Sequence, residues 1–108
     1  GKKINSLVDF IILKGGQPLA GITIQAIAPA APIVKINGLA VDTNRNYIVL
    51  TSDYLANGGD GILAFTKPIN KVNLQYKIRD AILDYVQSQQ LLGKTINPNI
   101  DGRISIKQ

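Results

Sequence analysis

Apolar residues recur in this sequence with the periods of both helices and strands, and their order along the chain predicts an α+β domain. Over residues 4–13 they follow the spacing i, i+3, i+4, i+7, one face of a helix expected over residues 3–14. The same spacing returns over residues 74–92, and glycines follow both segments as helix-end signals. Because strand signals lie between and after these segments, we expect a small mixed or mostly antiparallel sheet with two helices.

The expected strands share a β-rich, apolar composition and are bounded by turn residues; they cover residues 21–28, 33–36, 39–41, 47–51 and 102–107. Apolar residues on both sides of Asn37-Gly38 predict a hairpin at that pair. Residues 47–51 are apolar on both faces, which is typical of a central strand. Residues 62–65 fit either a short strand or the first turn of a helix.

The residue types that are missing limit the chemistry of the chain. Its 108 residues, expected to form a single domain over 1–108, include no Cys, His, Glu, Met or Trp. Without Cys and His, the usual zinc sites, the catalytic triads and a histidine general base are excluded. Aspartates are the only side-chain carboxylates, which leaves open an all-aspartate site for a hard cation. We expect no catalytic residue and no metal site in this chain.

The distribution of charge favours a solvated, mildly basic surface. The net charge is +5, but the lysines are scattered and are not interleaved with aromatic residues, as they are in many nucleic-acid binders. We therefore expect no nucleic-acid partner. A small basic nucleic-acid binder stays as an alternative hypothesis, beside the two given at the end of this subsection. No apolar run approaches the roughly 20 residues that span a membrane, so no membrane span is expected.

The densest turn signal is SDYLANGGDG, residues 52–61, which directly follows an apolar run. One interpretation is a tight turn in which Asp60 accepts hydrogen bonds from neighbouring backbone amides. The other is a loop whose glycines let the backbone approach a ligand. Asp53 likewise either caps the next segment or faces a ligand at the end of a strand. The spacings of the EF-hand and the P-loop are both absent.

Four segments together resemble the C-terminal domain of the 5'-nucleotidase family, which includes 5'-nucleotidases, UDP-sugar hydrolases and 2',3'-cyclic-nucleotide phosphodiesterases. Residues 36–61, INGLAVDTNRNYIVLTSDYLANGGDG, are similar to a run in the family that ends in Y-L-A-N-G-G-D-G. Residues 79–86 are similar to its last long helix, 101–104 to its closing G-R-I strand, and 15–24 to a glycine-containing loop and strand. The resemblance covers nearly the whole chain.

The resemblance implies a division of labour between two domains. In the family, an N-terminal metallophosphatase domain holds two divalent metals and hydrolyses the phosphate ester, and the C-terminal domain binds the nucleoside or other leaving group. The enzymes are exported. For this chain the resemblance implies a nucleotide or nucleotide-sugar substrate, a metallophosphatase domain in cis or in trans, no cofactor of its own, and a periplasmic or extracellular location.

The implied substrate-binding residues lie in two segments; they are Gly16, Gln17, Asn57, Gly58, Gly59, Asp60, Gly61, Ile62 and Phe65. The family stacks a base between two aromatic rings, but Ile62 occupies one of these positions and neither Gly16 nor Gln17 is aromatic. Stacking contributes roughly 1–3 kcal/mol per base, so losing both rings is expected to weaken binding on the order of 100-fold. Phe65 is either a substitute ring or a core residue.

Two further hypotheses follow. The first is a substrate-recognition part of a nucleotide-hydrolysing enzyme. The second is a non-catalytic binding or interaction module that kept the fold and lost the base-stacking site. The chain also lacks the family's early C-terminal-domain segment with its phosphate-binding arginines, and missing strands would expose a sheet edge. Such an edge promotes pairing between copies, so a homodimer is expected.

Overall fold

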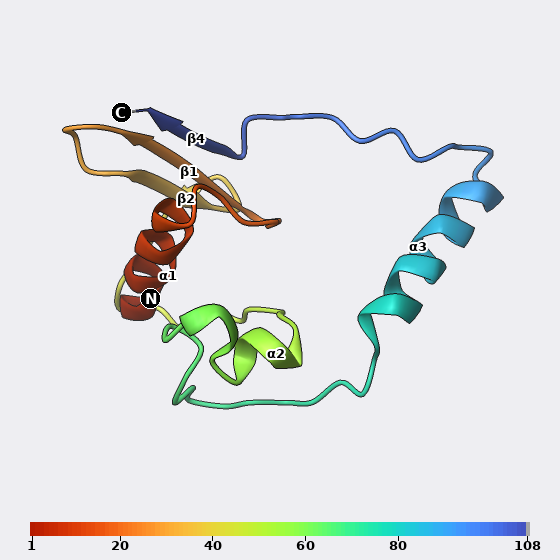
Figure 1. The fold of residues 1–108 in the computed structure, drawn as a ribbon, viewed down its shortest axis with the longest axis horizontal. Helices are drawn as coiled ribbons and strands as arrows, with labels where there is room; N and C mark the ends of the chain where they lie inside the picture. Colours follow the sequence, from red (N-terminus) through yellow and green to blue (C-terminus); the bar gives the residue numbers. More distant parts are fainter. Residues whose placement is uncertain (108) are drawn as a thin grey trace. The chain divides into compact units, whose positions relative to one another are not determined.

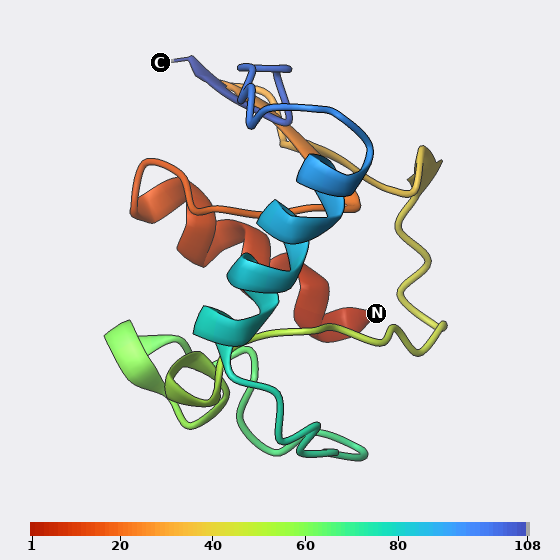
Figure 2. The same ribbon diagram turned by 90° about the vertical axis from the view of Figure 1, so that its right-hand side faces the viewer.

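The computed structural model describes residues 1–107 and has the expected α+β architecture (Figures 1 and 2). Its helices are α1 (Lys2–Leu13), α2 (Asp53–Ala56) and α3 (Ile78–Leu91), with one 3-10 turn, η1 (Gly59–Gly61). Its strands are β1 (Ile22–Ile27), β2 (Ile33–Ile36), β3 (Leu39–Ala40) and β4 (Ile104–Lys107). None of the helices described is both long and apolar enough to cross a membrane.

The described chain divides into two compact units. Residues 1–66 and 100–107 form the sheet unit, which contains α1, α2 and every strand, and residues 67–99 form the helix unit, which contains α3. The single domain expected over residues 1–108 stays a prediction, because the division into units does not decide whether they fold together.

The sheet is mixed, with strand order β3-β2-β1-β4. β2 pairs antiparallel with β1 and β3, whereas β4 pairs parallel with β1. The hairpin predicted at Asn37-Gly38 is confirmed, since this pair joins β2 to β3 with φ angles of 51° and 80°. Positive φ at both central residues is the backbone that a two-residue hairpin of type I′ requires.

The core of the sheet unit lies between α1 and one face of the sheet. Ile4, Val8 and Ile11 are buried along α1, as their helical spacing predicts, and they pack with Ile24 of β1. Burial alternates along β1, so every second side chain faces away from α1. Figure 2 shows α1 below the sheet, with α2 on the other side of α1.

The central strand predicted over residues 47–51 is wrong. This segment has no regular secondary structure, Ile48 is fully exposed and Leu50 is 81% exposed. Apolar, β-branched residues form a strand only where a neighbouring strand accepts their hydrogen bonds. In the described chain, β1 and β2 already have strands on both sides, and the segment pairs with neither edge strand. Tyr47 alone in this segment packs against the core.

Residues 62–65, expected as a strand or a helical turn, form neither. Ile62 is extended, and a turn follows in which the backbone N–H of Thr66 donates to the carbonyl of Leu63 at 3.1 Å. Ile62 is only 2% exposed, so the segment is held by a buried side chain and not by a regular hydrogen-bond ladder.

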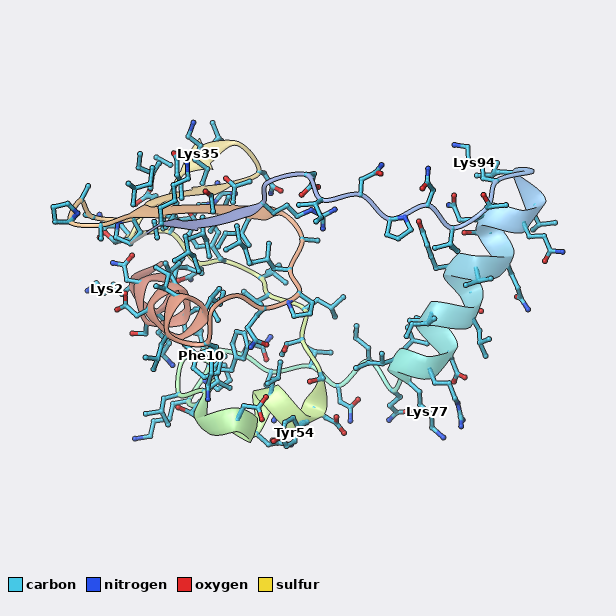
Figure 3. All side chains as sticks on the ribbon, turned by 45° about the horizontal axis from the view of Figure 1, so that its top comes forward. Lys2, Phe10, Lys35, Tyr54, Lys77 and Lys94 are labelled. Carbon is cyan, nitrogen blue, oxygen red and sulfur yellow. The ribbon has the colours of Figure 1, made fainter. Side chains whose placement is uncertain are left out.

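The helix unit contains the second predicted helix, shortened at its N-terminus. The periodicity begins at residue 74, but α3 starts at Ile78 and has no side-chain cap. It ends at Leu91, and Gly93 follows with a φ of 70°, as the end signal predicts. Figure 3 shows Lys77 and Lys94 flanking the helix. Its expected apolar face is exposed, with Ile82 at 57%, because residues 67–99 contain no other helix or strand to cover it.

An ion pair fixes the entry into β4. Nε of Arg103 donates to Oδ2 of Asp101 at 2.6 Å, and its Nη1 donates to the carbonyl of Leu19 at 2.8 Å. The hydrogen bond from the Arg103 side chain lowers the pKa of Asp101.

We expect a pH dependence from this pair. Because the pKa of Asp101 is lower in the folded state than in the unfolded one, the stabilisation is present above the unfolded value of about 3.9 and is lost as pH falls through the folded value. NMR titration of the side-chain carboxyl carbon should give a lower midpoint in the native protein than in Arg103→Gln. Equal midpoints in the two proteins would contradict the pairing.

Candidate functional site

The segment that leaves residues 47–51 begins with a capped helical turn. Ser52 is the N-cap of α2, and its Oγ accepts a hydrogen bond from the backbone N–H of Leu55 at 3.2 Å. Asp53 is the first helical residue, and its Oδ1 accepts from the N–H of Tyr54 at 2.8 Å. The cap interpretation of Asp53 is thus corrected: Ser52 caps the helix, and Asp53 bonds the next residue in its first turn.

Tyr54 ties this helix to the glycine loop that follows. Its hydroxyl donates to Oδ1 of Asp60 at 2.9 Å and accepts from the backbone N–H of Asp60 at 3.2 Å. The Asp60 carboxylate was expected to accept hydrogen bonds from neighbouring backbone amides. It accepts instead from the hydroxyl of Tyr54, so the expected partner is wrong. The reason is that Asp60 has a φ of 56°, a left-handed conformation that sequence spacing does not reveal.

The loop needs glycine for two different reasons. Gly58 and Gly61 have φ angles of 91° and 78°, which glycine adopts without strain. Gly59 is required by contact, because a Cβ atom there would lie 2.6 Å from both Cε1 and the carbonyl oxygen of Tyr54. The tyrosine ring and the loop backbone are therefore packed directly against each other.

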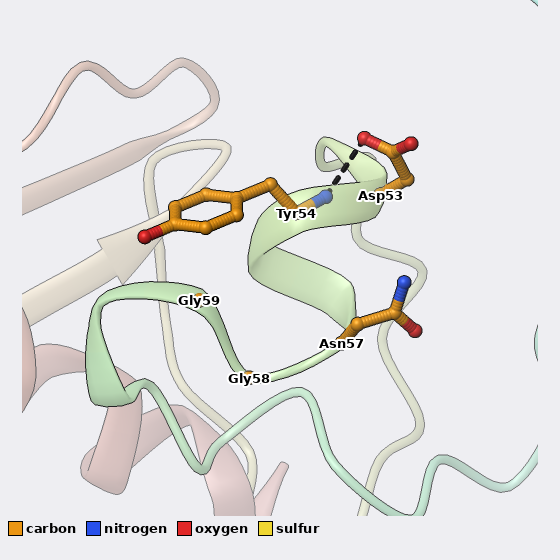
Figure 4. A pocket seen from close by; sticks show the side chains of 5 residues that line it. All are labelled: Asp53, Tyr54, Asn57, Gly58 and Gly59. Atoms are coloured by element: carbon orange, nitrogen blue, oxygen red, sulfur yellow. Dashed lines mark hydrogen bonds between the residues drawn. The ribbon is translucent and has the colours of Figure 1, made fainter.

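An open hollow of about 470 Å³ lies at this place; it is lined by Asp53, Tyr54, Asn57, Gly58 and Gly59. Figure 4 shows the Tyr54 ring extending to one side of α2, above the two glycines, and the side chains of Asp53 and Asn57 on the other side. All three side chains are exposed. An exposed aromatic face therefore lies on one side of α2, and an exposed carboxylate and carboxamide lie on the other.

The structure brings only part of the expected site together. Asn57, Gly58 and Gly59 line the hollow, and Asp60 lies next to it through its bonds with Tyr54. The side chain of Ile62, which occupies a ring position of the family, is buried. Phe65 is half-buried.

The second expected segment lies elsewhere in the sheet unit. Gly16 and Gln17 are half-buried, and a Cβ atom on Gly16 would lie 3.9 Å from Cδ1 of Ile104 in β4. Figure 1 shows the sheet and α2 on opposite sides of α1. Neither Gly16 nor Gln17 lines the hollow beside α2.

The sequence left Asp53 open between a cap and a ligand-facing residue, and Tyr54 was not among the predicted binding residues. Their place directly before the glycine loop was the available signal, because residues that flank a loop supported by regular structure often face ligands. The role of Tyr54 depends on a side chain that reaches six residues ahead, which no local pattern indicates.

This arrangement offers groups that can bind a ligand. Hydroxyl groups of a ligand can bond the Asp53 carboxylate and the Asn57 amide, and a planar group can stack on the Tyr54 ring. In residues 1–107, no three side chains of His, Cys, Asp or Glu lie together as potential metal ligands. Recognition of a polar, partly planar ligand is the chemistry that these side chains support.

Removing the Tyr54 hydroxyl should loosen the loop without unfolding the protein. Tyr54→Phe deletes two hydrogen bonds at an exposed site, each contributing about 0.5–1.5 kcal/mol, and leaves the ring in place. We expect faster amide hydrogen exchange at residues 58–61 with little change in α1. As a control, Tyr85→Phe on α3 should leave exchange in the loop unchanged. Amide exchange at residues 58–61 as slow in Tyr54→Phe as in the native protein would contradict a role of these hydrogen bonds in holding the loop.

Comparisons with known proteins identify what this segment is similar to. Residues 16–67, which include β1, β2, β3, α2 and the glycine loop, match the family described as 5'-nucleotidase, C-terminal domain. A cell wall protein of Listeria monocytogenes is 32% identical over 73 residues, which are 68% of this chain and 9% of that protein. The matched part of the chain therefore spans about a tenth of that relative's length. No solved structure matches the chain.

Proposed function

Residues 16–67 belong to the 5'-nucleotidase C-terminal domain family, and on this basis we propose that the chain is the substrate-recognition part of an exported nucleotide-hydrolysing enzyme. It binds the nucleoside or sugar part of a nucleotide or nucleotide sugar. A separate metallophosphatase domain, in cis or in trans and with two divalent metals, hydrolyses the phosphate ester. The observation that carries this proposal is that the family match includes the loop and every residue that lines the hollow.

The side chains at the hollow suit a nucleoside. Asp53 and Asn57 offer an acceptor and an amide for sugar hydroxyls, and the Tyr54 ring, 60% exposed, offers one face for stacking. A single stacked face contributes about 1–3 kcal/mol. Residues without aromatic rings occupy the two positions where the family stacks a base. We therefore expect dissociation constants on the order of 1 mM for nucleosides.

We also propose that the protein acts outside the cytoplasm, in the periplasm or extracellular space. The family and the cell wall protein that resembles this chain both favour export. Fractionation of the native host with an antibody against this chain tests the proposal. Recovery of the protein with cytoplasmic markers would contradict it.

One observation favours the second hypothesis, a non-catalytic binding or interaction module. The side chain of Ile62 is 2% exposed, so it supports the interior and presents no surface to a base. A protein that kept the glycine loop for its fold and lost the ligand would have this arrangement.

Calorimetric titration with adenosine, AMP and a UDP-sugar separates the two hypotheses. Saturable binding that Asn57→Ala weakens about threefold or more, as expected for the loss of one hydrogen bond, supports substrate recognition. Asn5→Ala, which changes another exposed asparagine, on α1, is the matched control and should bind like the native protein. An absence of heat with all three ligands at about 10 mM would favour the non-catalytic module.

We propose a homodimer formed through a sheet edge. β3 and β4 are the two edge strands of the open sheet, and each presents one unpaired side. Sedimentation velocity should show dimers whose population rises with protein concentration. A monomer throughout the accessible concentration range would contradict the dimer while leaving the nucleotide-recognition proposal intact.

A further inference from the structure

We propose that the sheet face turned away from α1 binds a phosphate group through Lys35, Thr23 and Arg103. A hollow of about 370 Å³ lies there; it is lined by Ala20, Gly21, Ile22, Thr23, Lys35, Asn37, Gly38 and Arg103. This site is separate from the glycine loop, since the sheet and α2 lie on opposite sides of α1 (Figure 1). It does not rest on the proposed recognition of nucleosides.

Strand register places the three side chains in one row. Thr23 of β1 lies opposite Lys35 of β2, and Ile24 lies opposite Ile104 of β4, so Arg103 is level with Thr23. The burial of Ile24 against α1 puts Thr23 on the opposite face, and its cross-strand neighbours project with it. Adjacent strands are about 4.8 Å apart, so two cations flank a hydroxyl within reach of one small ligand.

The two cations retain capacity for a ligand. The side chain of Lys35 makes no hydrogen bond or ion pair within the part of the chain that the structure describes, although its backbone is paired in the sheet. Arg103 is oriented by Asp101 and the Leu19 carbonyl through Nε and Nη1, and no bond within residues 1–107 uses its Nη2. Asp101 balances part of the charge of Arg103, but no carboxylate is among the lining residues of the hollow.

A backbone hydrogen bond fixes the rim of the hollow. The N–H of Asn37 donates to the carbonyl of Gly21 at 2.8 Å, joining the hairpin turn to the start of β1. A Cβ atom on Gly38 would have open space around it, so this point of the rim is not covered. A ligand can therefore reach Lys35 and Thr23 without moving the sheet.

This chemistry matches a phosphate better than a carboxylate. A guanidinium whose orientation is fixed donates directed hydrogen bonds to an oxyanion, and an ammonium adds a point charge. A tetrahedral dianion can accept from Arg103, Lys35 and the Thr23 hydroxyl at once. Because both cations are exposed, we expect a dissociation constant for phosphate on the order of 1 mM, and we expect it to rise as salt is added.

NMR titration of the whole chain with inorganic phosphate and with glycerol 3-phosphate tests the site. We expect saturable amide shifts at residues 21–23 and 35–38, and weaker binding of acetate. Equal affinity for both phosphates assigns the site to the free ion, and tighter binding of the ester assigns it to a phosphomonoester. Adenosine, which has no phosphate, reports on the glycine loop alone and keeps the two proposals distinguishable.

Variants decide whether the row is the site. Lys35→Gln should weaken phosphate binding about threefold or more, whereas Lys2→Gln, an exposed lysine on α1, should not. Arg103→Lys keeps the charge and loses the planar fork, so it should also weaken binding while β1 amides keep their native shifts. Equal phosphate affinity in Lys35→Gln and Lys2→Gln, or shifts spread evenly over all lysines, would overturn the proposal.

Discussion

Replacing Ile24 by alanine is expected to destabilise the sheet unit by about 2–5 kcal/mol. The side chain is 1% exposed, and it packs in the core cluster with Ile4, Val8 and Ile11 of α1. Removing it leaves a cavity between the helix and the sheet, and small domains have only about 5–15 kcal/mol of total stability. Urea unfolding followed by circular dichroism measures the loss.

Ile48→Ala is the matched control, because it makes the same chemical change at a fully exposed position. We expect its free energy of unfolding to lie within about 0.5 kcal/mol of the native value. This control also tests the absence of a strand over residues 47–51. A loss at Ile48 as large as that at Ile24 would mean that this segment is buried, and would contradict the fold.

Replacing Gly59 by alanine is expected to abolish the hollow beside α2. The new methyl group would lie 2.6 Å from the ring and the carbonyl oxygen of Tyr54, and one of these contacts is with backbone. Because overpacking of this kind costs about 1–3 kcal/mol, the loop should move and the bonds between Tyr54 and Asp60 should break. Loss of nucleoside binding and altered Tyr54 ring signals by NMR are the expected results.

Gly61→Ala separates this clash from backbone strain. Gly61 has a φ of 78° but nothing within 4 Å of a Cβ atom, so the variant carries strain of about 1–2 kcal/mol without overlap. We expect its Tyr54 signals to remain native. If Gly59→Ala also kept native Tyr54 signals, the close packing of ring and loop would be refuted.

Local patterns predicted the elements whose partners lie next to them. The buried positions of α1 follow from a period that its own residues carry, and the hairpin follows from Asn37-Gly38. The sheet was expected to be mixed or antiparallel, and the parallel pairing of β4 with β1 decides for mixed. The strand predicted at 47–51 failed because its formation depends on a distant partner, which the composition of the segment does not specify.

The site was predicted less completely than the fold. The glycines of the loop were visible in the sequence, but the side chain that organises them was not, because Tyr54 contacts Asp60 six residues ahead, where Asp60 has a positive φ. Ile62 was placed at a ligand by resemblance, and its burial depends on how the following turn folds back. Gly16 was likewise grouped with the loop, yet it lies beside β4. Spacing along the chain does not give these distances.

The most direct measurement is the NMR titration of the native chain with adenosine, following backbone amides and the Tyr54 ring. Substrate recognition predicts saturable shifts confined to residues 53–60 and the Tyr54 ring, with native α3 signals. No shift at about 10 mM adenosine, a concentration well above the expected dissociation constant, would contradict substrate recognition by the glycine loop.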